Sequence, residues 1–103
     1  MSELATAIPS LRAKTLEGRI SWEDLAGGSF ITRLGELSVE LRRDRDGDIF
    51  LSLLDESGRR IERTSDLPPQ LAQMLDDLYE RARRQALRVD ERIDALHKKL
   101  DLL

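Results

Sequence analysis

An apolar stripe through the last third of the sequence constrains the fold more than any other feature. Its members recur at steps of three and four residues, without glycine or proline between them: Leu71, Leu75, Leu78, Ala82, Ala86, Val89, Ile93, Leu96, Leu100 and Leu103. This spacing places them on one face of an α-helix, and Pro68 and Pro69 suit the first turn of such a helix. The sequence therefore predicts one long C-terminal helix over residues 68–102, with a heptad-like repeat that contains one stutter between positions 82 and 86.

The predicted helix is too long for a small sheet to cover. A helix over residues 69–103 would span roughly 50 Å, whereas a strand of average length spans about 17–20 Å. A sheet can therefore shelter the stripe only from Leu71 to Ala82, and the second half needs another cover. Either a helix near the N-terminus or a second copy of the chain could supply it. The second copy predicts a homodimer, with a self-interface made by Val89, Ile93, Leu96, Leu100 and Leu103.

The middle of the chain, residues 29–64, changes to a period of two. Leu37, Val39 and Leu41 alternate with polar residues, which predicts a strand with one buried face. Residues 49–54 are apolar on both faces, which favours a place in the interior of the sheet. We expect an antiparallel meander of three or four strands, preceded by an irregular segment in which Gly27 and Gly28 form a flexible joint.

The N-terminal residues 1–18 have helical spacing and complete an α+β domain. Ser2 is a candidate cap, Pro9 predicts either a kink or the true start of the helix, and Gly18 is a plausible stop. The expected architecture is therefore an N-terminal helix, a β-meander and a long C-terminal helix within one domain, residues 1–103.

Composition excludes several kinds of function. The 103 residues contain no cysteine, which excludes disulfides, thiolate catalysis and thiolate metal sites. The net charge of −3 gives no reason to expect nonspecific attraction to nucleic acid or to an anionic membrane, and an aromatic content of 4% argues against platforms that stack bases. The first residues do not resemble a secretion signal, so we expect a cytoplasmic protein without membrane contact.

The stretch DRDGD at residues 44–48 raises the question of a calcium loop. Asp44, Asp46 and Asp48 match the first three ligand positions, but Ile49 occupies the position that requires glycine and Asp55 the position of the bidentate glutamate. The dipeptide of Asp46 and Gly47 is instead preferred in two-residue hairpin turns. The sequence predicts a hairpin tip and no metal site.

No catalytic constellation can be assembled from this sequence. His97 is the only histidine, and it falls near the end of the predicted long helix, where it is usually solvated. Without a partner histidine or a cysteine there is no nucleophile–base pair and no metal-ligand set. We therefore expect a protein that is not an enzyme and needs no cofactor.

Two surfaces remain as binding candidates. Arg81, Arg84, Arg88 and Arg92 form a ridge beside the apolar stripe and could contact phosphates, but seven acidic side chains balance seven basic ones between Leu67 and Leu103, which favours ion pairing within the helix. The second candidate is an apolar patch on the other face of the sheet. The N-terminal helix could cover it; if that helix packs on the long helix instead, the patch is a partner groove made by Trp22, Phe50 and Leu54.

The segment LYERARRQALRVDERIDAL at residues 78–96 resembles the final helix of a group of short uncharacterised bacterial proteins with an LYxxARRxALxVD pattern. Those proteins also carry a G-x-I-x-W element, here Gly18, Ile20 and Trp22, and DESG-like turns, here residues 55–58. Pro9 departs from their pattern. The resemblance implies a stand-alone bacterial helix–sheet–helix domain and brings no activity with it.

Together these patterns favour a small non-catalytic module that binds another protein. The short chain, its negative net charge and the lack of a catalytic constellation suggest a regulatory role accessory to a larger bacterial effector, as in stress response or phage defence. A nucleic-acid-binding regulator that uses the arginine ridge across a dimer is the alternative from another class. A small-molecule sensor with a pocket around Trp22 is a third hypothesis.

Overall fold

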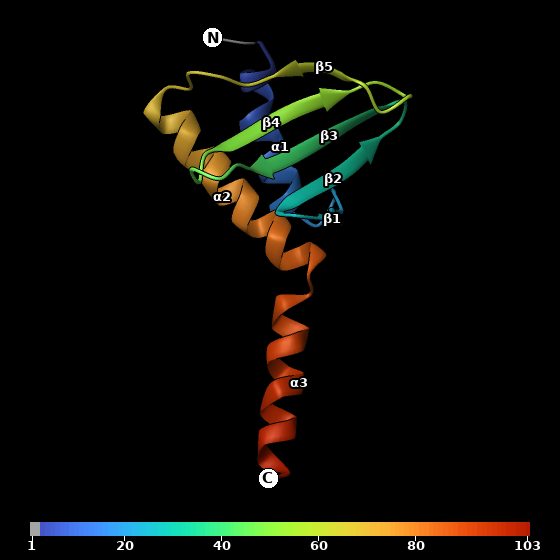
Figure 1. Cartoon of the computed structure of the whole chain (residues 1–103), viewed down its shortest axis with the longest axis vertical. Helices are drawn as coiled ribbons and strands as arrows, with labels where there is room; N and C mark the ends of the chain where they lie inside the picture. The colour runs from blue at the N-terminus through green and yellow to red at the C-terminus, as the bar shows by residue number, and fades with distance from the viewer. Residues whose placement is uncertain (1–2) are drawn as a thin grey trace.

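The structure is a computed structural model that describes residues 3–103. One antiparallel sheet with its strands in simple sequence order forms the centre of the molecule (Figure 1). The strands are β1 Glu23–Ala26, β2 Ser29–Leu34, β3 Leu37–Arg43, β4 Ile49–Leu54 and β5 Arg60–Arg63. The α+β class and the meander are therefore confirmed. The strand β4 lies between β3 and β5, in the interior position predicted from its two apolar faces.

The sheet has five strands, so the prediction of three or four was wrong. The missing strand is β1, whose four residues are all exposed and therefore show no alternation of apolar and polar side chains. The joint predicted at Gly27 and Gly28 is a hairpin turn instead, because Ala26 pairs with Ser29 on either side of it. Both glycines have positive φ, +64° and +81°, which is the backbone that a tight two-residue hairpin turn requires.

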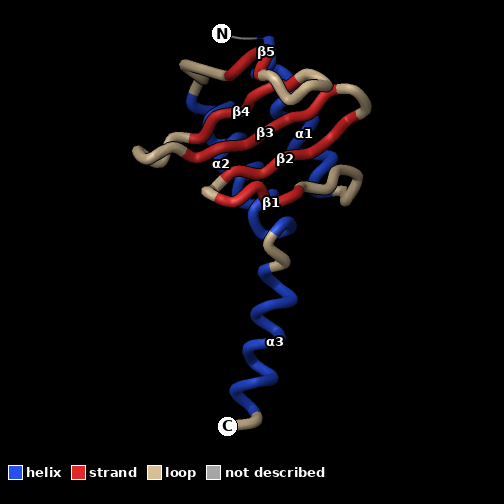
Figure 2. Tube along the Cα trace, turned by 45° about the vertical axis from the view of Figure 1, so that its right-hand side comes forward, coloured by secondary structure: helices blue, strands red, loops and turns tan. Residues whose placement is uncertain are grey.

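Two helices lie side by side on one face of the sheet, behind it in the view of Figure 2. A 3₁₀ turn, Glu3–Ala7, leads into α1, Ile8–Leu16, and α2 spans Pro69–Ala86. Pro9 lies in the first turn of α1, as one of the two sequence readings expected, and the cap predicted at Ser2 lies outside the described residues. Gly18 ends α1 with a φ of +73°.

The core lies between these helices and the inner face of the sheet. Burial of a large apolar side chain contributes about 1.5–3 kcal/mol, and this layer is the only extensive one in the described residues. It joins side chains of all three parts: Ile8 and Leu11 from α1, Phe30, Val39, Leu41 and Leu51 from the sheet, and Leu75, Leu78, Tyr79 and Ala82 from α2. We call residues 3–87 the body.

The long C-terminal helix is broken, which corrects the prediction of a single helix over residues 68–102. The helix α2 ends at Ala86, and α3, Val89–Asp101, begins after Arg88 takes a left-handed conformation with φ +54° and ψ +46°. A left-handed residue commonly ends a helix, but it is usually glycine, so an arginine at this position does not indicate a break. Leu87, the last residue before the break, still packs against the core.

Beyond the break the chain leaves the body as a projecting arm (Figure 1). We call residues 89–103 the C-terminal arm. The arm makes the molecule 53 × 31 × 28 Å, and its radius of gyration of 15.2 Å exceeds the ~13 Å expected for a compact chain of about 100 residues. Among the described residues, no helix combines the length and the apolar character needed to cross a membrane.

Candidate interaction surfaces

The apolar stripe on the C-terminal arm is open to solvent. Leu96 and Leu100 are each 53% exposed, Val89 is half-buried, and no residue of α3 is buried. Leu87, Val89, Ile93 and Leu96 line an open apolar hollow of about 360 Å³ with Arg92. The predicted self-interface residues therefore share one accessible face. The N-terminal helix, which was one of the two possible covers, packs on α2 and leaves the arm bare.

The polar side chains of the arm are arranged to suit its helix. Asp90 and Glu91 lie in the first turn of α3 and Lys98 and Lys99 in the last, which matches the sign of the helix dipole at each end. His97 is exposed, and its side chain makes no hydrogen bond or ion pair in the described part of the chain. Its position is that of a solvated surface histidine.

Trp22 is a structural anchor within the core. Its side chain is 4% exposed, and its indole Nε1–H donates a hydrogen bond of 3.0 Å to Thr15 Oγ1 on α1. Its backbone N–H donates to Gln85 Oε1 on α2 at 2.7 Å, while Gln85 Nε2 donates to the Ile20 carbonyl oxygen at 3.1 Å. These bonds fix the segment before β1 against both helices.

The predicted patch of Trp22, Phe50 and Leu54 is therefore divided. Phe50 and Leu54 are half-buried and belong to the outer face of the sheet, on the side away from Leu51 and the helices, whereas Trp22 lies in the core. Sequence spacing could not separate them, because Trp22 precedes a strand that the alternation pattern did not reveal. Because Trp22 is 4% exposed, it is not available as a surface anchor.

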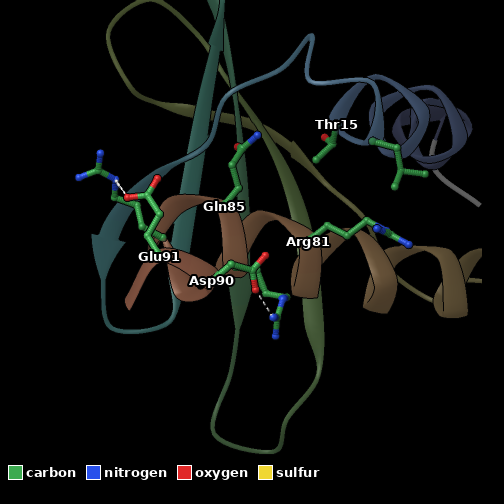
Figure 3. Close-up of a pocket in the computed structure, with 8 residues that line it drawn as sticks. Thr15, Arg81, Gln85, Asp90 and Glu91 are labelled. Carbon is green, nitrogen blue, oxygen red and sulfur yellow. Dashed lines mark hydrogen bonds and ion pairs between the residues drawn. The ribbon is translucent and has the colours of Figure 1, made fainter. Parts of the chain in front are cut away.

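The arginine ridge is mostly neutralised by neighbouring carboxylates. Figure 3 shows the lining of a hollow of about 420 Å³ at the junction of α2 and α3, with Arg81 and Gln85 from α2 and Asp90 and Glu91 from α3. Arg84 Nη2 lies 2.6 Å from Asp90 Oδ1, and Arg88 Nε lies 3.3 Å from Glu91 Oε2. These two pairs bridge the break between the helices.

The third ridge arginine belongs to a pair of helices. Arg81 Nε lies 2.8 Å from Asp77 Oδ2, and Arg12 Nε of α1 approaches the same oxygen at 2.6 Å. Hydrogen bonds from Arg81 and then Arg12 lower the pKa of Asp77 below its usual value. Of the ridge residues in the described chain, only Arg92 has no carboxylate partner.

The DRDGD stretch forms the predicted hairpin tip, although its loop is one residue longer than expected. The Asp44 N–H donates to the Asp48 carbonyl oxygen at 2.9 Å, which leaves a three-residue loop with Gly47 at φ +87°. Carboxylate oxygens of Asp44, Asp46 and Asp48 lie within 4.8 Å of one another. Asp44 Oδ1 already accepts the backbone N–H groups of Asp46 and Asp48, both at 2.9 Å, so this carboxylate holds the turn.

The outer face of the sheet carries a cluster that the sequence reasoning missed. Four arginines from β3, β5 and the β3–β4 turn line one shallow hollow of about 410 Å³: Arg42, Arg45, Arg60 and Arg63. Arg43 borders the same hollow, but its guanidinium lies against the Tyr79 ring of α2. The signal was present in part, because the alternation of Leu37, Val39 and Leu41 leaves Arg42 on the polar face of the same strand. The strand register that brings Arg42 opposite Phe50, and Arg63 opposite Ser52, cannot be read from spacing alone.

No family model, curated protein or solved structure matches this chain. The resemblance to short bacterial helix–sheet–helix proteins therefore stays a prediction, and the functional argument depends on the geometry of the chain itself.

Proposed function

We propose that this protein is a non-catalytic protein-interaction module that forms a homodimer through its C-terminal arm and serves a larger partner protein. One observation carries the proposal: the arm projects from the body with a continuous apolar stripe that no described element covers. Monomeric proteins rarely expose such stripes, and those that do usually use them to bind.

The spacing of the stripe suits a second copy of the same helix. Ile93 and Leu100 are seven residues apart, as are Leu96 and Leu103, and the two sets alternate as the a and d positions of a coiled coil do. A symmetric dimer buries the same patch on both copies, so one stripe is enough for a closed assembly.

The expected affinity is moderate. Because all the stripe residues except Leu103 are already partly shielded, completing their burial contributes about 1 kcal/mol each, or roughly 10 kcal/mol for ten side chains in the dimer. Association itself costs an estimated 4–15 kcal/mol. The dimer should therefore dissociate on dilution within a range that solution measurements can reach.

Light scattering after gel filtration, at micromolar concentration, tests the proposal. The unaltered chain should have the mass of a dimer, and Leu96→Glu should have the mass of a monomer because it places a charge in the seam. Ala95→Glu is the matched control: it adds the same side chain one residue away, outside the stripe, and should remain a dimer. A monomeric unaltered chain, or equal dissociation of both variants, would contradict the proposal.

The nucleic-acid alternative has less support. A phosphate-binding ridge needs guanidinium groups that are free to contact phosphates, and three of the four ridge arginines are within ion-pair distance of carboxylates on α2 and α3. Binding there would first require those pairs to break.

A further inference from the structure

The outer face of the sheet is the second open surface of the molecule. Both α1 and α2 lie on the inner face, and none of the described elements crosses the outer one (Figure 2). Strand register places Arg42 beside Phe50, and Ser52 beside Arg63, on this outer face. We call the depression lined by the outer-face side chains Arg42, Arg45, Arg60 and Arg63 the arginine hollow.

The guanidinium groups of the arginine hollow are not neutralised within the described chain. None of its four arginines forms an ion pair there, in contrast to Arg81, Arg84 and Arg88 on the ridge. The Arg63 guanidinium lies 4.5 Å from the centre of the Phe50 ring. Such stacking orients a guanidinium and leaves its N–H edges free.

The local charge is opposite to that of the whole chain. Asp44 is the only acidic residue in the lining, and its Oδ1 is already engaged by two backbone N–H groups. Four positive side chains thus lie around one carboxylate in a chain whose net charge is −3. Positive charges held close together repel one another, and binding of an anionic partner would relieve this repulsion.

The arrangement of basic residues inside the hollow and acidic residues around it favours a short anionic segment of a protein over a nucleic acid. Guanidinium forks bind carboxylates in bidentate pairs. The hollow has acidic borders, with Asp46 and Asp48 exposed on the adjoining turn and Glu40 next to Ser52 in register. A long phosphate backbone would have to cross these carboxylates, whereas a few adjacent acidic side chains can end inside the hollow. The Phe50 ring is also covered by Arg63 and is not free to stack a base.

We propose that the arginine hollow binds a short carboxylate-rich segment of the partner protein; this inference rests on the proposed interaction function and identifies the chemistry of the partner. The site lies on the body, so it does not require the arm. Binding and dimerisation are therefore separable properties of the chain.

Fluorescence anisotropy with a labelled hexaglutamate peptide, at about 50 mM salt to limit screening, tests the inference. The full chain should bind the peptide, and Arg42→Gln combined with Arg63→Gln should weaken binding about tenfold or more. Lys14→Gln combined with Lys98→Gln is the matched control: it removes the same charge from exposed lysines outside the hollow and should change the dissociation constant less than about twofold. A second pair, Arg45→Gln with Arg60→Gln, tests the other side of the hollow and should also weaken binding.

Three results would overturn the inference. They are the absence of peptide binding by the unaltered chain, equal weakening by the hollow and control pairs, and displacement of the peptide by an oligothymidylate at far lower concentration than unlabelled hexaglutamate. The last result would identify a nucleic acid as the occupant. Leu96→Glu separates this test from the dimer test. If this variant is a monomer and binds the peptide with unchanged affinity, the arginine hollow binds anionic peptides independently of dimerisation.

Discussion

The two halves of the apolar stripe have the same pattern and opposite surroundings. In the body, Leu75 and Leu78 are almost completely buried against the sheet and α1. In the arm, Leu96 and Leu100 continue the same spacing and are half exposed. The two halves differ because the sheet and α1 do not extend along the arm (Figure 1). An amphipathic pattern therefore tells which face of a helix seeks burial, and the extent of its neighbours decides whether the same chain can provide it.

Truncation of one leucine in each half should give the largest contrast. Leu78→Ala opens a cavity in the core and should lower the free energy of unfolding by about 2–5 kcal/mol, whereas Leu96→Ala should cost less than about 0.5 kcal/mol in dilute solution, where the arm is unpaired. Urea denaturation at submicromolar concentration measures both. At high concentration Leu96→Ala should become more costly, because dimerisation stabilises the folded chain.

A large decrease in the free energy of unfolding by Leu96→Ala in dilute solution would contradict this contrast between body and arm. It would mean that the arm folds back onto the body. Ala95→Gly, which changes the same arm without touching the stripe, is the control for a general loss of helix, and it should cost about 1 kcal/mol or less.

Much of the body could be predicted because its signals are local. Alternation within residues 29–64 predicted an antiparallel meander, the two apolar faces of residues 49–54 predicted an interior strand, and the DRDGD stretch was predicted to be a hairpin tip. The strand β1 could not be predicted, because an exposed edge strand pairs through its backbone and needs no apolar pattern. The meeting of Arg42 and Arg63 in one hollow could not be predicted for a similar reason: register between strands is a property of the sheet, and spacing within one strand does not determine it.

The break between body and arm could not be predicted either, because Arg88 is an ordinary helix former in a helical pattern. The conformation at this residue gives the second contrast. Glycine tolerates a left-handed backbone that costs alanine about 1 kcal/mol or more, whereas glycine within a continuous helix is about 1 kcal/mol worse than alanine.

The sign of the difference in free energy of unfolding between Arg88→Gly and Arg88→Ala should therefore show whether the helix is broken at residue 88. With the break at φ +54°, the glycine variant should be the more stable by about 1 kcal/mol in urea denaturation. If the alanine variant is the more stable, body and arm form one continuous helix in solution. Both variants remove the ion pair with Glu91, so its loss cancels in the comparison.

The smallest contrast concerns two carboxylates, one in each region. Asp77 in the body accepts hydrogen bonds from Arg12 and Arg81, which lower its pKa below the usual 3.8. Asp94 in the arm has no ion pair in the described chain. A lowered pKa means that the ionised form stabilises the fold above the pKa of the unfolded chain, and that this contribution is lost as the pH falls through the folded-state value.

Asp77→Asn should thus lower the free energy of unfolding at pH 7 by about 0.2–1 kcal/mol, a range reduced by solvent screening because the side chain is 37% exposed. The deficit relative to the unaltered chain should shrink as the pH falls below about 4. Asp94→Asn should change little at either pH. Urea denaturation at pH 7 and pH 3 measures these differences, and a deficit for Asp77→Asn that persisted at pH 3 would show that the side chain acts by packing, with no role for its charge.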